Sequence, residues 1–480
     1  KISYSYLNYS FISSIAKNTF YQAFSKFFGA IIGLITVALM TRYLGQTGYG
    51  HYTTIVAFLQ FFGVLADFGL QMTTTKILAE PGSDNSKIFG NIFTLRIISS
   101  IFFLGSSVLI VWLIPYPLII KQGISIASLS FFFISLQSIF ISIFQKNMAM
   151  AKVALAEIFT RSIALIGIWL SVYNNLGLLP IIGSIVGGNA ISCSILFFSS
   201  AKYLKLKPEI DLAIWKKIWS VAWPLAITIA LTLIYFRADT VILSLFRPQN
   251  EVGLYGATYK VLEVLVQFPY LFLGLILPLL TNFFAIDRKM FELIIQKGFD
   301  FMIIIVIPMI FAVLFLGEKI MLFIAGPEFI VSGSLLRILI FATALIYIGA
   351  LFGYAIVAAN LPKKMIKFYL IDAVISLVLY LIFIPIFSYW AAAYITIITE
   401  LIITVASYYV LKKYTHIKIK PQIIYKAVLA SLIMSVFLFI LINQNLITLV
   451  IVGLLIYFWA IYILKGFSKK MVLEIINPLK

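Results

Sequence analysis

Fourteen apolar stretches of about 20 residues or more restrict the fold of this chain more than any other feature. They cover residues 18–41, 51–75, 89–114, 118–144, 153–173, 178–201, 218–245, 253–284, 291–316, 330–358, 366–385, 388–411, 424–443 and 446–464. About 20 apolar residues in a helix cross the hydrocarbon core of a bilayer. Only 11% of the residues are charged, against about 25% in soluble domains. The sequence therefore predicts an all-α polytopic membrane protein with about 14 transmembrane helices.

The basic residues indicate how these helices are oriented. With the N-terminus in the cytoplasm, 27 Lys and Arg residues, Arg96 among them, fall on the cytoplasmic side and four in the opposite loops. Such an excess marks the cytoplasmic side, so both termini are predicted to lie there. The same bias accounts for the net charge of +19 without a nucleic-acid partner.

A Gly-rich turn near the N-terminus has a second, weaker copy. Residues Gly48-Tyr49-Gly50-His51-Tyr52 separate two apolar stretches, and Val252-Gly253-Leu254-Tyr255 follows at an offset of 203 residues. We interpret this offset as a repeat of six plus six helices with two helices appended. The predicted domains are an N-terminal lobe over 1–205, a C-terminal lobe over 206–415, and helices 13 and 14 with a cytoplasmic tail over 416–480.

Five basic residues fall inside the predicted spans, namely Lys26, Arg161, Arg237, Lys260 and Arg337. A charged side chain in a span should face a partner or a water-filled cavity. As a group these residues would line a cationic cavity able to bind phosphate, for which Arg is well suited. The alternative is ion pairing, either within one helix, as for Glu157 with Arg161 and Lys260 with Glu263, or with carboxylates on other helices.

A second candidate site consists of oxygen donors. Asp239, Asp372 and Glu400 lie within predicted helices 7, 11 and 12, and Thr396 lies one helical turn before Glu400. Carboxylate and hydroxyl oxygens suit a hard cation such as Na⁺, or a proton relay. Structural pairing with an Arg of another helix is the alternative. No other cofactor is expected, since the sequence has no P-loop and one cysteine, Cys193.

The motifs around the first turn resemble a known family. Arg42-Tyr43-Leu44-Gly45, Gly48-Tyr49-Gly50-His51-Tyr52 and Leu65-Ala66-Asp67-Phe68-Gly69-Leu70 are similar to segments of the polysaccharide (O-antigen or teichoic-acid) flippases. That family belongs to the multidrug, oligosaccharidyl-lipid and polysaccharide exporter superfamily. Arg42, Gly45, Gly50 and Asp67 are the motif residues that carry the resemblance.

The resemblance implies a V-shaped bundle of two six-helix lobes that works by alternating access in the cytoplasmic (inner) membrane. Its members move a polyprenyl-diphosphate-linked oligosaccharide to the outer leaflet, using cationic cavity residues. It also implies coupling to Na⁺ or H⁺ through helices 7, 11 and 12. We accordingly expect a monomeric transporter rather than an enzyme, whose partners are this substrate and membrane lipids, with no nucleic acid.

Three other functions compete with this expectation. An exporter of organic cations on the same fold would need a net acidic cavity, whereas the predicted one is basic. A membrane glycan polymerase would need a large external loop, and no predicted external loop exceeds about 15 residues. A scaffold without transport would leave the charges inside the spans unexplained.

Overall fold

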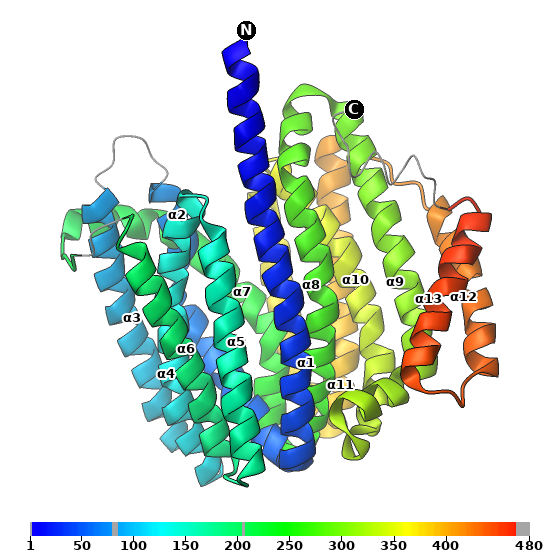
Figure 1. Ribbon diagram of the computed structural model, residues 1–480, viewed down its shortest axis with the longest axis horizontal. Coiled ribbons are helices and arrows are strands. Elements are labelled where there is room, and N and C mark those ends of the chain that lie inside the picture. Colours follow the sequence, from blue (N-terminus) through cyan, green and yellow to red (C-terminus); the bar gives the residue numbers. More distant parts are fainter. Residues whose placement is uncertain (1, 79–84, 204–206, 467–480) are drawn as a thin grey trace. The chain divides into compact units, whose positions relative to one another are not determined.

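The computed structural model describes residues 2–78, 85–203 and 207–466, and these residues fold almost entirely into helices (Figure 1). The helices are α1 Ile2–Asp67, α2 Leu70–Leu78, α3 Asn85–Leu113, α4 Leu118–Lys146, α5 Met150–Tyr173, α6 Leu178–Ser200, α7 Leu212–Phe246, α8 Gln249–Ile286, α9 Arg288–Ala325, α10 Val331–Ala358, α11 Ile366–Thr415, α12 Gln422–Ile440 and α13 Leu446–Ile463. Two short 3₁₀ helices, η1 Pro327–Phe329 and η2 Pro362–Lys364, precede α10 and α11. The all-α fold class predicted from the sequence is confirmed.

Two of these helices each contain two of the predicted spans. The first bends at Gly45, with φ 64° and ψ −174°, and the chain returns from this bend to α2, which lies toward the same end as the N-terminus (Figure 1). Helix α11 bends in the same way at Ser388, with φ 56° and ψ −143°. The predicted loop over residues 42–50 is thus a single non-helical residue, for which Gly supplies the positive φ.

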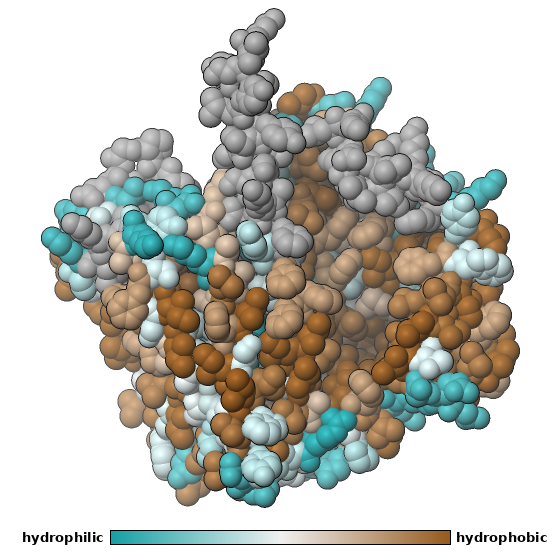
Figure 2. All heavy atoms as spheres, viewed as in Figure 1, coloured by the Kyte–Doolittle hydropathy of each residue, from teal (hydrophilic) through white to brown (hydrophobic). Residues whose placement is uncertain are grey.

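The helices have the length and composition of membrane spans. Eleven helices among the described residues are long and apolar enough to cross a membrane, including the two bent ones. When each bent helix is counted twice and the 35-residue α7 is added, every one of the fourteen predicted spans has a helix at its position. Large apolar side chains cover the surface between hydrophilic ends (Figure 2), as expected of a multi-pass membrane protein.

The chain divides into two compact units within α8, Lys1–Gly256 and Ala257–Lys480. In the first unit α4 packs against α1, α3 and α6, and α5 packs between α1 and α6. In the second, α10 packs between α9 and α11, and α12 packs between α9 and α13. The predicted lobes over 1–205 and 206–415 were defined by a repeat in the sequence, whereas these units are defined by contacts between residues. The lobes therefore stay a prediction. The tail of the predicted third domain, 467–480, lies outside the described residues.

Candidate functional site

The two copies of the Gly-rich motif meet each other in the structure. A Cβ atom on Gly50 would lie 1.7 Å from the Gln249 carbonyl oxygen, and one on Gly253 would lie 2.0 Å from that of Gln46. Gln46 and Gln249, like Gly50 and Gly253, are separated by the repeat offset of 203 residues. The contact is therefore reciprocal, and glycine at both positions lets the two backbones touch.

The crossing places the bend of α1 and the start of α8 side by side. The Thr54 hydroxyl donates a 2.7 Å hydrogen bond to the Gln249 side-chain oxygen. Among the other motif residues, the Arg42 guanidinium donates to the Ala38 carbonyl at 3.2 Å. By the predicted orientation this crossing joins the second and eighth spans at their external ends.

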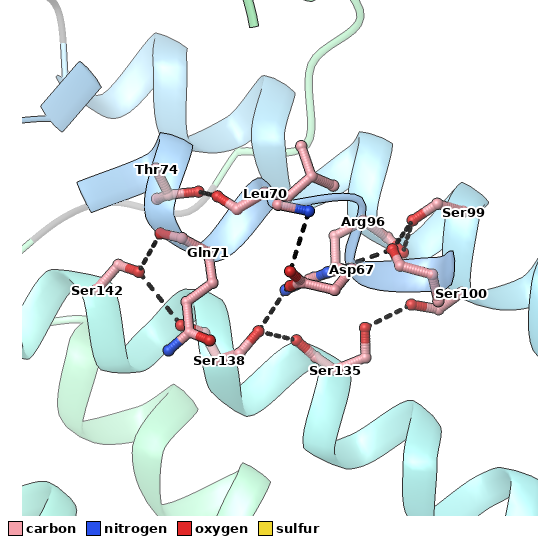
Figure 3. Close-up of polar contacts among 12 residues, drawn as sticks. Asp67, Leu70, Gln71, Thr74, Arg96, Ser99, Ser100, Ser135, Ser138 and Ser142 are labelled. Carbon is pink, nitrogen blue, oxygen red and sulfur yellow. Dashed lines mark hydrogen bonds and ion pairs between the residues drawn. The ribbon is translucent and has the colours of Figure 1, made fainter. Parts of the chain in front are cut away.

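Asp67, the last motif residue, pairs with a buried arginine from α3 (Figure 3). Arg96 is fully buried and donates hydrogen bonds to the Asp67 carboxylate, to the Ser138 hydroxyl and to the Ala66 carbonyl. The Asp67 carboxylate also accepts a 3.1 Å hydrogen bond from the Gly69 backbone amide. The pair therefore holds the break between α1 and α2, where Phe68 and Gly69 have φ of 46° and 71°.

Arg96 is the residue that sequence reasoning missed. The count of basic residues places it on the cytoplasmic side, but Arg96 lies eleven residues inside α3 with no exposed surface. Its partners are Asp67, 29 residues earlier in the chain, and Ser138, 42 residues later. The carboxylate of Asp67 inside a predicted span could have indicated this partner, because such a group needs a cation or hydrogen-bond donors nearby.

Two of the predicted cavity cations lie where α1 packs against α5. The Lys26 ammonium is 3.6 Å from the Glu157 carboxylate, and its side chain is 44% exposed. Glu157 also accepts a 2.5 Å hydrogen bond from Ser25, while Arg161 donates a 2.8 Å hydrogen bond to the Gly29 carbonyl. The predicted pair of Glu157 with Arg161 is corrected, because α1 supplies each of them with a closer partner.

The remaining cations also have partners. Lys260 and Glu263 form the predicted local ion pair, with 2.7 Å between nitrogen and oxygen. Arg337 of α10 pairs with Glu318 of α9 at 2.8 Å. The side chains of Lys260 and Arg337 are each 34% exposed. Arg237 of α7 is half-buried, two residues from Asp239.

Asp239 is held by donors of its own unit. It is 1% exposed and accepts a 2.5 Å hydrogen bond from the Tyr255 hydroxyl of α8. The Thr240 amide and hydroxyl donate to the other carboxylate oxygen at 2.5 and 3.1 Å. These donors can stabilise a carboxylate inside the helices without a metal ion.

Asp372 and Glu400 have no such donors in the part of the chain that the structure describes. They lie on the two halves of α11 and are 0% and 6% exposed, close enough to repel each other electrostatically. Neither oxygen of Asp372 has a hydrogen-bond partner among the described residues. Thr396, one helical turn before Glu400, donates its hydroxyl proton to the Ala392 carbonyl at 2.8 Å.

Comparison with known proteins agrees with this architecture. The sequence profile of the family described as "Polysaccharide biosynthesis protein" matches residues 15–284. A curated relative, the "Probable low-salt glycan biosynthesis flippase Agl15" of Haloferax volcanii, is 22% identical over 426 residues, which cover 88% of this chain and 89% of that one.

Solved structures show the same fold. "Lipid II flippase MurJ, inward closed conformation" has a TM-score of 0.79 at 16% identity, covering 92% of this chain and 98% of that one. An inward-facing multidrug resistance MATE family transporter of the MOP superfamily has a TM-score of 0.66 at 12% identity, covering 80% and 94%. The MATE multidrug transporter DinF-BH has a TM-score of 0.61 at 18% identity, covering 86% and 96%.

Proposed function

This chain belongs to the polysaccharide biosynthesis protein family, and we propose that it flips a polyprenyl-diphosphate-linked oligosaccharide from the cytoplasmic to the outer leaflet. It is a membrane transporter with the fold of lipid flippases and multidrug exporters. In the proposal it is a monomer in the cytoplasmic membrane, with both termini in the cytoplasm. The substrate class follows from the charges inside its helices, and the flippase name of its relative supports it.

The observation that carries the proposal is the partial exposure of cations within apolar helices. The side chains of Lys26, Lys260 and Arg337 keep between a third and a half of their surface accessible. A cation facing hydrocarbon costs about 2.5–3.5 kcal/mol on insertion scales, so these side chains are expected to face water. Their ammonium and guanidinium groups would bind an anion.

In the proposal, the substrate diphosphate replaces the carboxylates that pair with these cations. Partly exposed ion pairs stabilise a protein by only about 0–1 kcal/mol, so Glu157, Glu263 and Glu318 are weak competitors for their cations. A diphosphate carries more charge, and Arg337 can bind it through two hydrogen bonds. Substrate would displace these carboxylates and exchange its water for cationic side chains, while the polyprenyl tail stays in lipid.

The driving force would come from Asp372 and Glu400. Two buried carboxylates without basic partners are unfavourable as a pair of anions, so at least one is expected to hold a proton or a cation such as Na⁺. In the proposal, binding and release of that ion bias alternating access. Thr396 would supply a further oxygen, and the part of Asp239 in ion coupling stays a prediction.

Reconstitution in proteoliposomes tests the proposal. Translocation of a diphosphate-linked oligosaccharide lipid would be scored by an enzyme added outside, under Na⁺ and H⁺ gradients separately. We expect Arg337→Ala and Lys26→Ala to reduce translocation at least about tenfold, the effect of one lost charged contact. Lys121→Ala, which removes a partly exposed cation near Trp112, is the control and should transport normally.

Two outcomes would overturn the proposal. Normal translocation in both Arg337→Ala and Lys26→Ala would show that these cations do not bind the substrate. Transport of a cationic dye without any lipid translocation would instead make the protein an organic-cation exporter, and Asp372 and Glu400 would then be its substrate-binding residues.

A further inference from the structure

A polar pocket of about 270 Å³ lies in the second unit, away from the charges discussed above. It is bounded by the first turns of α9, the start of α12 and the residues that follow α13. Its lining residues are Gln296, Asp300, Lys420, Gln422, Ile423, Lys426, Lys465 and Gly466. The predicted orientation places this end of the unit at the cytoplasmic face, where the basic residues concentrate.

Hydrogen bonds fix the walls of this pocket. The Gln296 amide nitrogen donates to the Lys420 carbonyl at 3.0 Å, and its oxygen accepts from the Lys420 backbone amide at 2.8 Å. The Lys426 ammonium donates a 3.0 Å hydrogen bond to the Lys465 carbonyl. Gln296 therefore ties the segment before α12 to α9, and Lys426 ties the end of α13 to α12.

The charge of the pocket is positive. Three lysines, Lys420, Lys426 and Lys465, line it together with one carboxylate, Asp300. Asp300 accepts a 2.8 Å hydrogen bond from the Gln296 side chain and interacts electrostatically with Lys426. Among the described residues, the ammonium groups of Lys420 and Lys465 have neither a hydrogen bond nor an ion pair. These two ammonium groups could therefore bind an anion in the pocket.

Exposed aromatic side chains place the pocket at the depth of the lipid headgroups. Tyr425 near the start of α12 is 70% exposed, and Trp459 and Tyr462 near the end of α13 are 61% and 59% exposed. Tyr and Trp concentrate where the hydrocarbon meets the headgroups. The surface of α12 and α13 is apolar between hydrophilic ends (Figure 2), as that position requires.

We propose that this pocket binds the phosphate of an anionic phospholipid from the cytoplasmic leaflet. Basic pockets between helices on this side of a membrane suit such headgroups, and a volume of about 270 Å³ accommodates a phosphate with its glycerol. The lipid would hold α9, α12 and α13 together at their cytoplasmic ends. The proposal does not depend on which substrate the protein transports.

Native mass spectrometry of the delipidated full-length protein tests this proposal. Phosphatidylglycerol, zwitterionic phosphatidylcholine, inorganic phosphate and a polyprenyl diphosphate would be titrated separately. We expect phosphatidylglycerol to bind, and its affinity to fall about a hundredfold when Lys420, Lys426 and Lys465 are all changed to Gln, at about one factor of five per lysine. The same three lysines changed to Arg should keep most of the affinity, because the charge remains.

A matched variant separates a site from a general positive surface. Lys363, Lys364 and Lys367 carry the same number of charges in the segment around η2, and changing all three to Gln should leave phosphatidylglycerol binding intact. Equal loss in both triple variants would overturn the proposal. So would tighter binding of inorganic phosphate or of polyprenyl diphosphate than of phosphatidylglycerol, since either result assigns the pocket to another phosphate source.

Discussion

The two pairs of charged residues deepest in the helices are built in opposite ways. In the first unit, Asp67 meets the fully buried Arg96, which also donates hydrogen bonds to the Ser138 hydroxyl and the Ala66 carbonyl, while its Nε has no partner among the described residues. In the second unit, Asp372 and Glu400 are both acidic and have no basic partner among the described residues. The first pair is electrically neutral as it stands, whereas the second needs a proton or a cation.

This difference separates a structural role from the role in transport that we propose for Asp372 and Glu400. A neutral, hydrogen-bonded pair specifies one arrangement of α1, α2 and α3, and removing one partner leaves the other uncompensated. A pair of carboxylates has no single stable protonation or ligand state, so its arrangement can depend on the ion gradient. We therefore expect substitutions in the two regions to change different measured quantities.

The largest effect on stability is expected for Asp67→Ala. This substitution leaves the Arg96 guanidinium buried without its counter-charge, which typically costs about 3–5 kcal/mol. Unfolding of the purified protein in detergent, followed by circular dichroism, would measure the change. Glu263→Ala is the control, because it breaks a partly exposed pair and should cost less than about 1 kcal/mol. Equal losses in the two variants would show that Arg96 does not depend on Asp67.

A smaller loss of stability is expected for Tyr255→Phe. The variant removes the hydroxyl that donates to Asp239, and an unsatisfied buried acceptor costs about 1–3 kcal/mol. Tyr347→Phe is a matched control, since that buried tyrosine donates to the neutral Leu265 carbonyl at 2.9 Å. If Tyr255→Phe proves no more harmful than this control, Asp239 has another partner, and its predicted part in ion coupling gains support.

Asp372→Asn should change stability by less than about 1 kcal/mol, or increase it, because it removes an unpaired buried charge. Its expected effect is on ion dependence. Ligand at a hundred times its dissociation constant stabilises a protein by about 2.7 kcal/mol, so a Na⁺-dependent rise in the unfolding temperature of the wild type should vanish. Choline chloride would keep the ionic strength constant.

The control for this experiment is Asp287→Asn, which changes an exposed carboxylate at the N-terminus of α9. It should leave the ion dependence intact. If the unfolding temperature still depends on Na⁺ or on pH in both Asp372→Asn and Glu400→Gln, the coupling ion binds elsewhere in the chain.

The sequence was a good guide to the spans and to two positions of close helix packing. Hydropathy depends on about 20 neighbouring residues at a time, so a helix lies at each of the fourteen predicted spans. The two copies of the Gly-rich motif contain Gly50 and Gly253, where the backbones touch. The pair Lys260–Glu263 was also predicted, since both residues lie on one helix turn.

Contacts between helices could not be predicted in this way. Glu157 pairs with Lys26, which is 131 residues away in the sequence, and Arg96 pairs with Asp67, which is 29 residues away. Each contact depends on which helices pack together and on the rotation of each helix about its axis. One sequence does not contain that information in its local pattern. The count of basic residues therefore placed Arg96 on the cytoplasmic side, although it lies inside the predicted span over 89–114.

The smallest effect on stability is expected when an ion pair outside the predicted spans is broken. Lys87 of α3 lies 2.8 Å from Asp211, which caps the N-terminus of α7. The hydrogen bond from Lys87, followed by that from the Ile214 amide, lowers the pKa of Asp211 below its usual value. A lowered carboxyl pKa stabilises the fold above the unfolded-state pKa of about 4, and the contribution disappears as the pH falls through the folded-state value.

Lys87→Met should therefore lower the unfolding temperature slightly at pH 7, and this difference should shrink as the pH falls and Asp211 becomes protonated. Asn91, whose side chain accepts a 2.6 Å hydrogen bond from the Asp211 amide, still holds the segment before α7 against α3 in this variant. A loss as large as that of Asp67→Ala would contradict the comparison, because it would give an exposed pair the importance of a buried one. Unfolding curves of both variants at pH 2, 4 and 7 would decide this.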